Sequence, residues 1–252
     1  MDTTTKQDFI AYKSAGKYIV KLQVPVGSHT NRGRRGVADP NRAKFRTDKA
    51  HVLKIRHKRT GRCVRSVRSD HDPMVRYIVG EDVVPRRGYN LDPDEVCASG
   101  IHFFLTREPA YDYDFEIRNG IFQVWHDNGQ LAATGMKKNN QMNGERKMYH
   151  ENGALFRSDN WINGKESGLC KIWTDDGFLK GMNICDEGML IKSIDYGACG
   201  HRMRFDIYDN YKLAMSMEYW HDTEISIEDK MNHEYQLLNN DILVLSPDYT
   251  SR

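Results

Sequence analysis

Three stretches of the second half, GIFQVWHDNGQL at 120–131, GERKMYHENGAL at 144–155 and GLCKIWTDDGFL at 168–179, align without gaps. They share a starting glycine, an aromatic residue in the middle, an Asn-Gly or Asp-Gly pair and a closing leucine. The period is 24 residues, and repetition at this scale is typical of repeat architectures. The second half is therefore predicted to use one small structural unit several times.

Each repeat is predicted to be a β-hairpin. The turn dipeptides are Asn128-Gly129, Asn152-Gly153 and Asp176-Gly177, with Asn163-Gly164 as a return turn. Such pairs tolerate the positive φ of a type I′ turn, and they lie between runs that alternate as strands do. Hairpins of this size cannot bury a face alone, so we expect them to pair edge to edge into one elongated antiparallel sheet. DIYDNYKL at 206–213 is interpreted as a degenerate last copy, and residues 226–245 as a cap.

The pattern G-x-x-x-x-[WY]-x-x-[ND]-G-x-L at this spacing resembles MORN repeats, in the variant found in bacterial and large-virus proteins. The resemblance covers residues 117–200. Independently of the resemblance, the aromatic column Trp125, Tyr149 and Trp173 is the candidate partner surface, because exposed aromatic residues are typical of interfaces. The alternative is that this column packs the hairpins against one another.

The first half alternates as half-buried strands do. KYIVKLQVPV at 17–26 is the clearest strand, and further strands are predicted at 51–56, 62–67, 75–84 and 101–105. Short helices are predicted at 8–14 and after Thr106, which would be the N-cap. The fold class is thus α+β and mostly β. Three regions are expected: a compact basic α+β module (1–115), repeats (116–200), and a degenerate repeat with a C-terminal cap (201–252).

Three phrases of the first half carry a second resemblance. RTDKAHVLKI at 46–55, SDHDPMVRYIVGEDVVP at 69–85 and CASGIHFFLTREPAYDY at 97–113 resemble a domain of unknown function that recurs in giant DNA viruses. That domain commonly precedes MORN-like repeats, so the order of the modules fits. The resemblance covers residues 14–115 and implies no activity. The Arg-rich segment at 28–45 is longer than the resemblance predicts.

Charge is distributed unevenly along the chain. Residues 1–115 carry 22 basic and 14 acidic side chains, whereas residues 116–252 carry 15 and 21. Within residues 28–68 the counts are 14 and 2, so an anionic partner would meet this segment first. The candidate contacts to an anion or nucleic acid are Arg32, Arg34, Arg35, Arg42, Lys44, Arg46, Arg56, Arg59 and Arg62. The alternatives are that these residues spread over several faces, or neutralise acidic groups of this chain or of a neighbour.

Catalytic and metal motifs are weak. Cys97 and His102 could form a nucleophile–base pair, with His71 and Asp72 in the same pocket, but no third residue or oxyanion hole is indicated. The five cysteines lack metal-ligand spacing. The His-Glu pairs at 150–151 and 233–234 lack the second histidine of H-E-x-x-H. No catalytic residue, metal or cofactor is therefore predicted.

We interpret the chain as a non-enzymatic interaction or scaffold protein of a large DNA virus, located in the virion or the host cytoplasm and not secreted. Its partner would be a viral or host protein, with nucleic acid as a further partner of the basic segment. A membrane partner is disfavoured because the second half is net negative. Two alternatives stay open: an enzyme of unknown reaction in the first module, and a membrane-apposed adaptor that uses the repeats.

Overall fold

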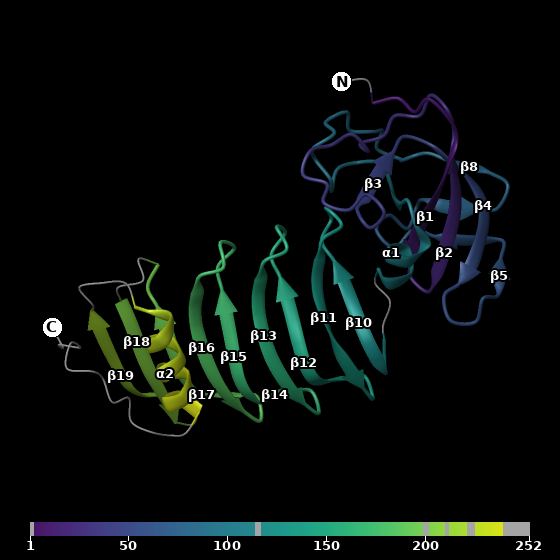
Figure 1. Cartoon of the computed structure of the whole chain (residues 1–252). Coiled ribbons are helices and arrows are strands. Elements are labelled where there is room, and N and C mark those ends of the chain that lie inside the picture. The colour runs from purple at the N-terminus through teal and green to yellow at the C-terminus, as the bar shows by residue number, and fades with distance from the viewer. Residues whose placement is uncertain (1–2, 114–116, 199–201, 210–211, 221–224, 239–252) are drawn as a thin grey trace. The chain divides into compact units, whose positions relative to one another are not determined.

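The strands dominate the computed structural model, which describes residues 3–113, 117–198, 202–209, 212–220 and 225–238. Backbone contacts divide the chain into two compact units. The N-terminal unit comprises residues 1–116 and 123–132, and the hairpin unit comprises residues 117–122 and 133–252. The predicted fold class is confirmed: the protein is mostly β, with a long antiparallel sheet of successive hairpins (Figure 1).

The N-terminal unit mixes strands from distant parts of the sequence in one sheet. Its order is β3-β9-β1-β2-β4-β5, with β8 beside β4, while β6 and β7 form a separate ribbon. The elements are β1 Phe9–Ala15, β2 Tyr18–Val24, β3 Lys44–Thr47, β4 Ala50–His57, β5 Cys63–Val64, β6 Ser66–Arg68, β7 Arg76–Ile78, β8 Asp82–Val83, β9 Ile101–Phe104 and α1 Arg107–Asp112. Because β9 pairs with both β1 and β3, the late strand closes the sheet around the early ones.

The core of this unit lies on one face of the sheet. Alternate residues of the strands point inward, as the period of two requires. Fully buried side chains include Val20, Leu22, Phe45, Ile55 and Phe103. The strands predicted at 17–26, 51–56 and 101–105 are confirmed as β2, β4 and β9.

Other local predictions for this unit are wrong. Residues 9–15 form β1 rather than a helix, because they pair along their whole length with β2. The strands predicted at 62–67 and 75–84 are each broken in two, the second around Gly80 at φ 86°. Thr106 is the N-cap residue of α1, but its hydroxyl donates to the carbonyl of Asn41 instead of capping the helix.

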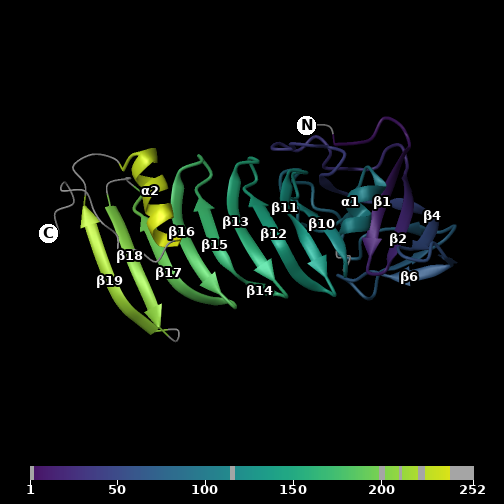
Figure 2. The ribbon, with the colours of Figure 1, turned by 60° about the horizontal axis from the view of Figure 1, so that its bottom comes forward.

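The sheet of the repeats follows the order of the sequence. Its path is β10-β11-β12-β13-β15-β16-β17-β18-β19, with β14 attached to β13 (Figure 2). The elements are β10 Gly120–Trp125, β11 Leu131–Lys138, β12 Gln141–Tyr149, β13 Leu155–Ile162, β14 Lys165–Glu166, β15 Gly168–Trp173, β16 Leu179–Asp186, β17 Met189–Tyr196, β18 Arg202–Asp209, β19 Lys212–Trp220 and α2 Ile227–Leu238. The degenerate copy at 206–213 lies in the hairpin β18–β19.

Two kinds of turn alternate along this sheet, and the prediction placed type I′ turns at the wrong one. At 128–129, 152–153 and 176–177 only the glycine has a positive φ, which fits a type I turn closed by a glycine bulge. Two positive φ values, as type I′ requires, occur at 139–140, 163–164 and 187–188. The Asn or Asp of the first kind acts through its side chain, as when Asn128 Oδ1 accepts the Gln130 amide at 2.9 Å.

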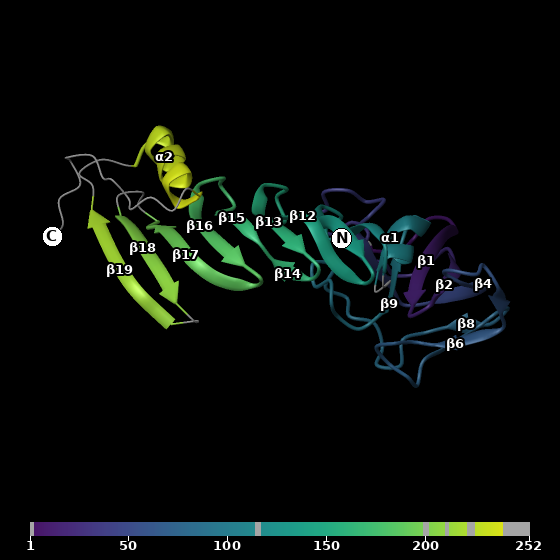
Figure 3. The same ribbon diagram turned by 90° about the horizontal axis from the view of Figure 1, so that it is seen from below.

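Apolar burial in the hairpin unit concentrates near its C-terminal end. Met182, Ile194, Tyr196, Met203 and Phe205 form a buried cluster with Tyr219 and Ile225. Helix α2 lies over one face of the sheet there (Figure 3). It is fixed by an ion pair of 2.6 Å between Glu234 and Lys171, and Tyr196 stacks on His233. The helical part of the expected cap is thus present, whereas residues 239–245 lie outside the described part of the chain.

Candidate functional site

One of the candidate basic residues is a structural group of the fold. Arg46 of β3 is fully buried. Its Nε donates to the carbonyl of Glu95 at 2.9 Å, its Nη atoms donate to the carbonyls of Asn90 and Asp92, and its guanidinium lies 4.8 Å from the Tyr89 ring. Because its donors are used inside the protein, Arg46 offers no contact to a partner.

Arg34, Arg42 and Lys44 are also engaged within the N-terminal unit. Arg34 donates to the carbonyl of Asp127 at 2.6 Å, and the Lys44 ammonium lies 2.8 Å from the Asp127 carboxylate. Burial alone would lower the pKa of Lys44, but the hydrogen bond and charge of Asp127 outweigh it and raise that pKa. The Arg42 guanidinium stacks 3.9 Å from the Trp125 ring. These three side chains hold residues 125–127 in place.

The remaining candidates are exposed, and they fall into two sets. Arg35 pairs with Asp94 at 2.8 Å, and hydrogen bonds from Arg35 lower the pKa of Asp94. Arg32 lies 4.5 Å over the Phe9 ring. Arg56, at the end of β4, and Arg59 and Arg62, in and after the following turn, make no salt bridge in the part of the chain that the structure describes.

Lys54 joins the unpaired set. It is exposed on β4, directly opposite Lys21 of β2, and it also has no salt bridge among the described residues. Arg56 lies two residues further on the same strand face. We call Lys54, Arg56, Arg59 and Arg62 the β4 basic surface. The sequence places all four in the basic segment at 28–68 and names the three arginines as candidate contacts, but it could not separate them from the engaged residues.

Cys97, His102, His71 and Asp72 do come together, in a cavity of about 590 Å³ in the N-terminal unit. They do not form a nucleophile–base pair. His102 Nε2 donates to the carbonyl of Val96 at 3.0 Å, and burial lowers the pKa of His102 to about 4. Cys97 Sγ instead donates to Asp127 at 3.5 Å and accepts a hydrogen bond from Lys44 at 3.7 Å.

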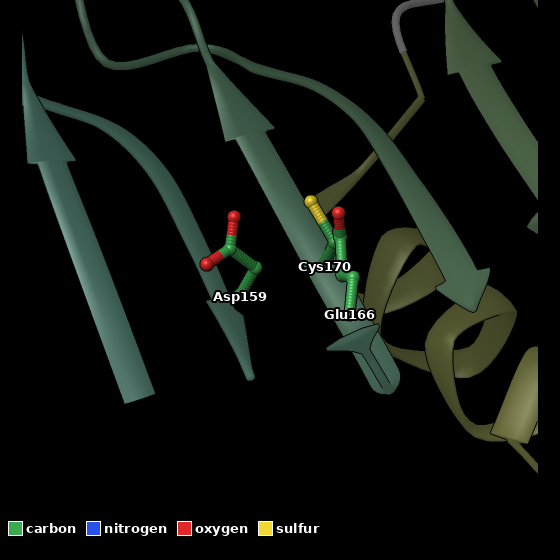
Figure 4. A group of neighbouring side chains, drawn as sticks. All are labelled: Asp159, Glu166 and Cys170. Atoms are coloured by element: carbon green, nitrogen blue, oxygen red, sulfur yellow. The ribbon is translucent and has the colours of Figure 1, made fainter. Parts of the chain in front are cut away.

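A second cluster lies in the hairpin unit, where Asp159, Glu166 and Cys170 bring their ligand atoms within 4.8 Å of one another (Figure 4). Its carboxylates are already satisfied. Asp159 accepts hydrogen bonds from Arg146 at 2.5 Å and from Arg157 at 2.6 Å, and Arg157 also donates to Glu166 at 2.5 Å.

The protonation states of this cluster oppose metal binding. Burial would raise the pKa of Asp159, but hydrogen bonds from Arg146, Arg157 and Trp161 lower it. Burial raises the pKa of the Cys170 thiol to about 12, so the thiolate that a metal needs is disfavoured. With two guanidinium groups on its carboxylates, this cluster is a buried ion-pair network rather than a metal centre.

The aromatic column is half-buried at all three positions. Trp125 stacks on Arg42, and the carbonyl of Trp173 accepts a hydrogen bond from His150 Nε2 at 3.0 Å. The first contact joins Trp125 to Arg42 within the N-terminal unit and the second involves the main chain of Trp173, so the role of the column as a partner surface and the packing alternative both stay predictions.

The fold and these surfaces define a mostly β protein in which a mixed-order sheet unit accompanies an antiparallel array of hairpins. Residues 1–110 match the model of a family of unknown function, DUF5758. No curated protein matches the chain. Within the described residues, neither helix is long and apolar enough to cross a bilayer.

Proposed function

We propose that this chain is a non-enzymatic interaction protein whose N-terminal unit binds an anionic partner through the β4 basic surface. One observation carries the proposal: Lys54, Arg56, Arg59 and Arg62 are exposed together on β4 and its following turn, with no salt bridge in the described part of the chain. The other candidate basic residues serve the fold or stack on it, or pair with a carboxylate.

The cost of this arrangement supports a binding role. Lys21 and Lys54 are direct cross-strand partners, and like charges in such a position repel. A partner with closely spaced negative charges would relieve that repulsion and release its own counterions, so binding would weaken steeply with salt. Arginine would add paired hydrogen bonds to each anionic group.

The hairpin unit would supply the second surface of a scaffold. Its repeats, with turns at Gly153 and Gly177, carry the pattern that resembles MORN repeats. This resemblance, together with that of the first module to a domain of giant DNA viruses, supports a viral protein of the virion or the infected cytoplasm. Its partner there would be a viral or host protein, with nucleic acid as the anionic partner of the first module.

The test uses the full chain and a mixed-sequence DNA duplex as the polyanion probe, titrated at several salt concentrations. The variant is Arg56→Gln/Arg59→Gln/Arg62→Gln. The matched control removes the same charge from exposed lysines of the hairpin unit, Lys138→Gln/Lys180→Gln/Lys212→Gln. We expect the first variant to bind at least about tenfold more weakly, with the salt slope reduced by about 2–3. The control should retain both values. Equal affinity and slope in the wild type and the first variant would refute the proposal.

A further inference from the structure

Lys13 is a buried lysine that makes no salt bridge among the residues that the structure describes. It lies on β1 with only 7% of its surface exposed. Its Nζ is 3.4 Å from the carbonyl of His102 and 5.8 Å from the centre of the Tyr77 ring. Among the described residues, no carboxylate lies within salt-bridge distance of it. An ammonium group has three donors, and within the described residues the carbonyl of His102 is the one acceptor within hydrogen-bond distance of this group.

This ammonium group lies beside open space. Lys13 lines the cavity of about 590 Å³ and a second one of about 290 Å³, and Cys97, His102 and His71 line both as well. A volume of this size is usual for a small-molecule site. The lining of the larger cavity holds the side chains of Lys13, His71, Asp72, Arg86, Arg87 and His102, and the low pKa of His102 leaves that imidazole neutral at pH 7.

The balance of these charges is positive. Lys13, Arg86 and Arg87 bring three positive charges to the cavity lining, where Asp72 is the one carboxylate and already accepts the Met74 amide at 3.1 Å. Asp70 lies outside the lining but its charge acts on Lys13, and it already accepts the Gly16 amide at 2.5 Å. A buried ammonium is costly unless an anion and hydrogen bonds compensate it. A phosphate monoester carries about 1.5 to 2 negative charges at neutral pH, which matches this surplus.

We propose that this cavity of the N-terminal unit binds a small phosphate monoester, whose phosphate oxygens accept hydrogen bonds from Lys13 and from the guanidinium groups of Arg86 and Arg87. The site is separate from the β4 basic surface and does not depend on it. The apolar wall, which includes Met74 and Ile101, would hold the organic part of the ligand.

The titration of Lys13 gives a signature of such a site. Burial lowers the pKa of Lys13 to about 8; the nearby charge of Asp70 opposes this shift, and that of Lys44 adds to it. Without ligand, the unfolded chain therefore binds more protons at Lys13 than the folded protein does between about pH 8 and 10.5. The free energy of unfolding consequently rises with pH in that window. Phosphate binding needs the charged lysine, so its affinity should fall as pH rises above about 8.

The decisive variant is Lys13→Met, which keeps an unbranched side chain one atom shorter than lysine and removes its charge. The full chain is titrated at constant ionic strength with inorganic phosphate and with AMP, using calorimetry and the shift in Tm. We expect the variant to be at least as stable as the wild type without ligand, because no buried charge remains to be compensated. Its affinity for AMP should fall at least tenfold. The control is Lys138→Met, which removes an exposed lysine of the hairpin unit that belongs to neither proposed surface and should bind AMP as the wild type does.

A second variant covers failure of the first to fold. Arg86→Gln/Arg87→Gln changes two exposed side chains of the same cavity and should also weaken AMP binding about tenfold. Tighter binding of AMP than of inorganic phosphate supports a site for the whole monoester, whereas equal binding identifies phosphate itself as the ligand. No binding of either probe to the wild type, or unchanged affinity in a folded Lys13→Met or Arg86→Gln/Arg87→Gln variant, would overturn the proposal. The variant of the β4 basic surface should retain AMP binding, which separates this result from the proposed function.

Discussion

In the N-terminal unit, the contacts that fix the fold join distant parts of the sequence. Phe45 of β3 packs on Phe103 of β9, and Arg46 is held by the carbonyls of residues 90–95. In the hairpin unit, the strands instead follow one another across the sheet in sequence order. The local arrangement repeats its turn residues at a fixed spacing, whereas the non-local one leaves no periodic trace. This difference explains why the arrangement of strands can be predicted from the sequence in the hairpin unit but not in the N-terminal unit.

The largest expected effect comes from a substitution that removes a non-local contact of the N-terminal unit. Arg46→Met should lower the free energy of unfolding by about 3–5 kcal/mol, because it leaves several buried carbonyl oxygens without donors. Arg56→Met, on the exposed end of β4, should change it by less than about 0.5 kcal/mol. Urea unfolding of the full chain measures both. Similar losses in the two variants would show that Arg46 does not hold the 90–95 segment.

The corresponding change in the hairpin unit is Asp159→Asn. It should lower the free energy of unfolding by about 2–3 kcal/mol, because Arg146 and Arg157 lose their shared anion. Asp186→Asn, at an exposed position, is the control.

The same variant changes the response to acid. The pKa of Asp159 is lowered in the folded state, so its stabilising contribution is present above the ordinary value of 3.8 and is lost as pH falls through the lower folded value. The wild type should therefore lose stability more steeply than Asp159→Asn below pH 3.8 in acid titrations followed by circular dichroism. Parallel acid curves would contradict the assignment of the ion-pair network.

Two equivalent glycines of the repeat have nearly the same backbone φ but different surroundings, so substituting each one separates the effect of backbone conformation from that of packing. Gly129 and Gly177 have φ values of 89° and 87°. A Cβ at Gly129 would lie 2.2 Å from the carbonyl oxygen of Asp39, whereas one at Gly177 meets nothing within 4 Å. Gly177→Ala should lower the free energy of unfolding by about 1 kcal/mol, because alanine disfavours the left-handed conformation. Gly129→Ala should lower it by more, because the added Cβ also collides with the main chain of Asp39. Equal thermal destabilisation would show that residues 39–43 do not pack on the first turn.

The smallest effect concerns thiol reactivity and leaves stability unchanged. Cys63 and Cys97 of the N-terminal unit are exposed, whereas Cys170 and Cys185 of the hairpin unit are buried. Burial raises the pKa of these two thiols to about 12 and about 11. Alkylation at pH 8, mapped by mass spectrometry, should modify the exposed pair rapidly and the buried pair only after unfolding. Fast labelling of Cys170 would contradict the packing between β15 and β16.

As with the fold, part of the candidate site could be predicted from the sequence and part depends on contacts between distant residues. The sequence located the concentration of basic residues, but the roles of Arg46 and Arg56 differ only because β3 is covered by residues 90–95 and the end of β4 is not. The sequence did not indicate Lys13 as a site residue, because its segment was predicted to be helical. Its position between Tyr12 and Ser14 on a central strand becomes visible only once β1 is paired on both sides.

By itself, the sequence determined the hairpin array and its 24-residue period, because turn glycines and alternating strands are local properties. It also determined the strand character of β2, β4 and β9 through their alternation. Only the tertiary structure decided that residues 9–15 are a strand, that Arg46 is buried while Arg56 is exposed, and that Lys13 faces a cavity. Those outcomes depend on which distant strands pair. Burial, charge compensation and cavity shape arise from contacts between such strands and cannot be found in any single segment.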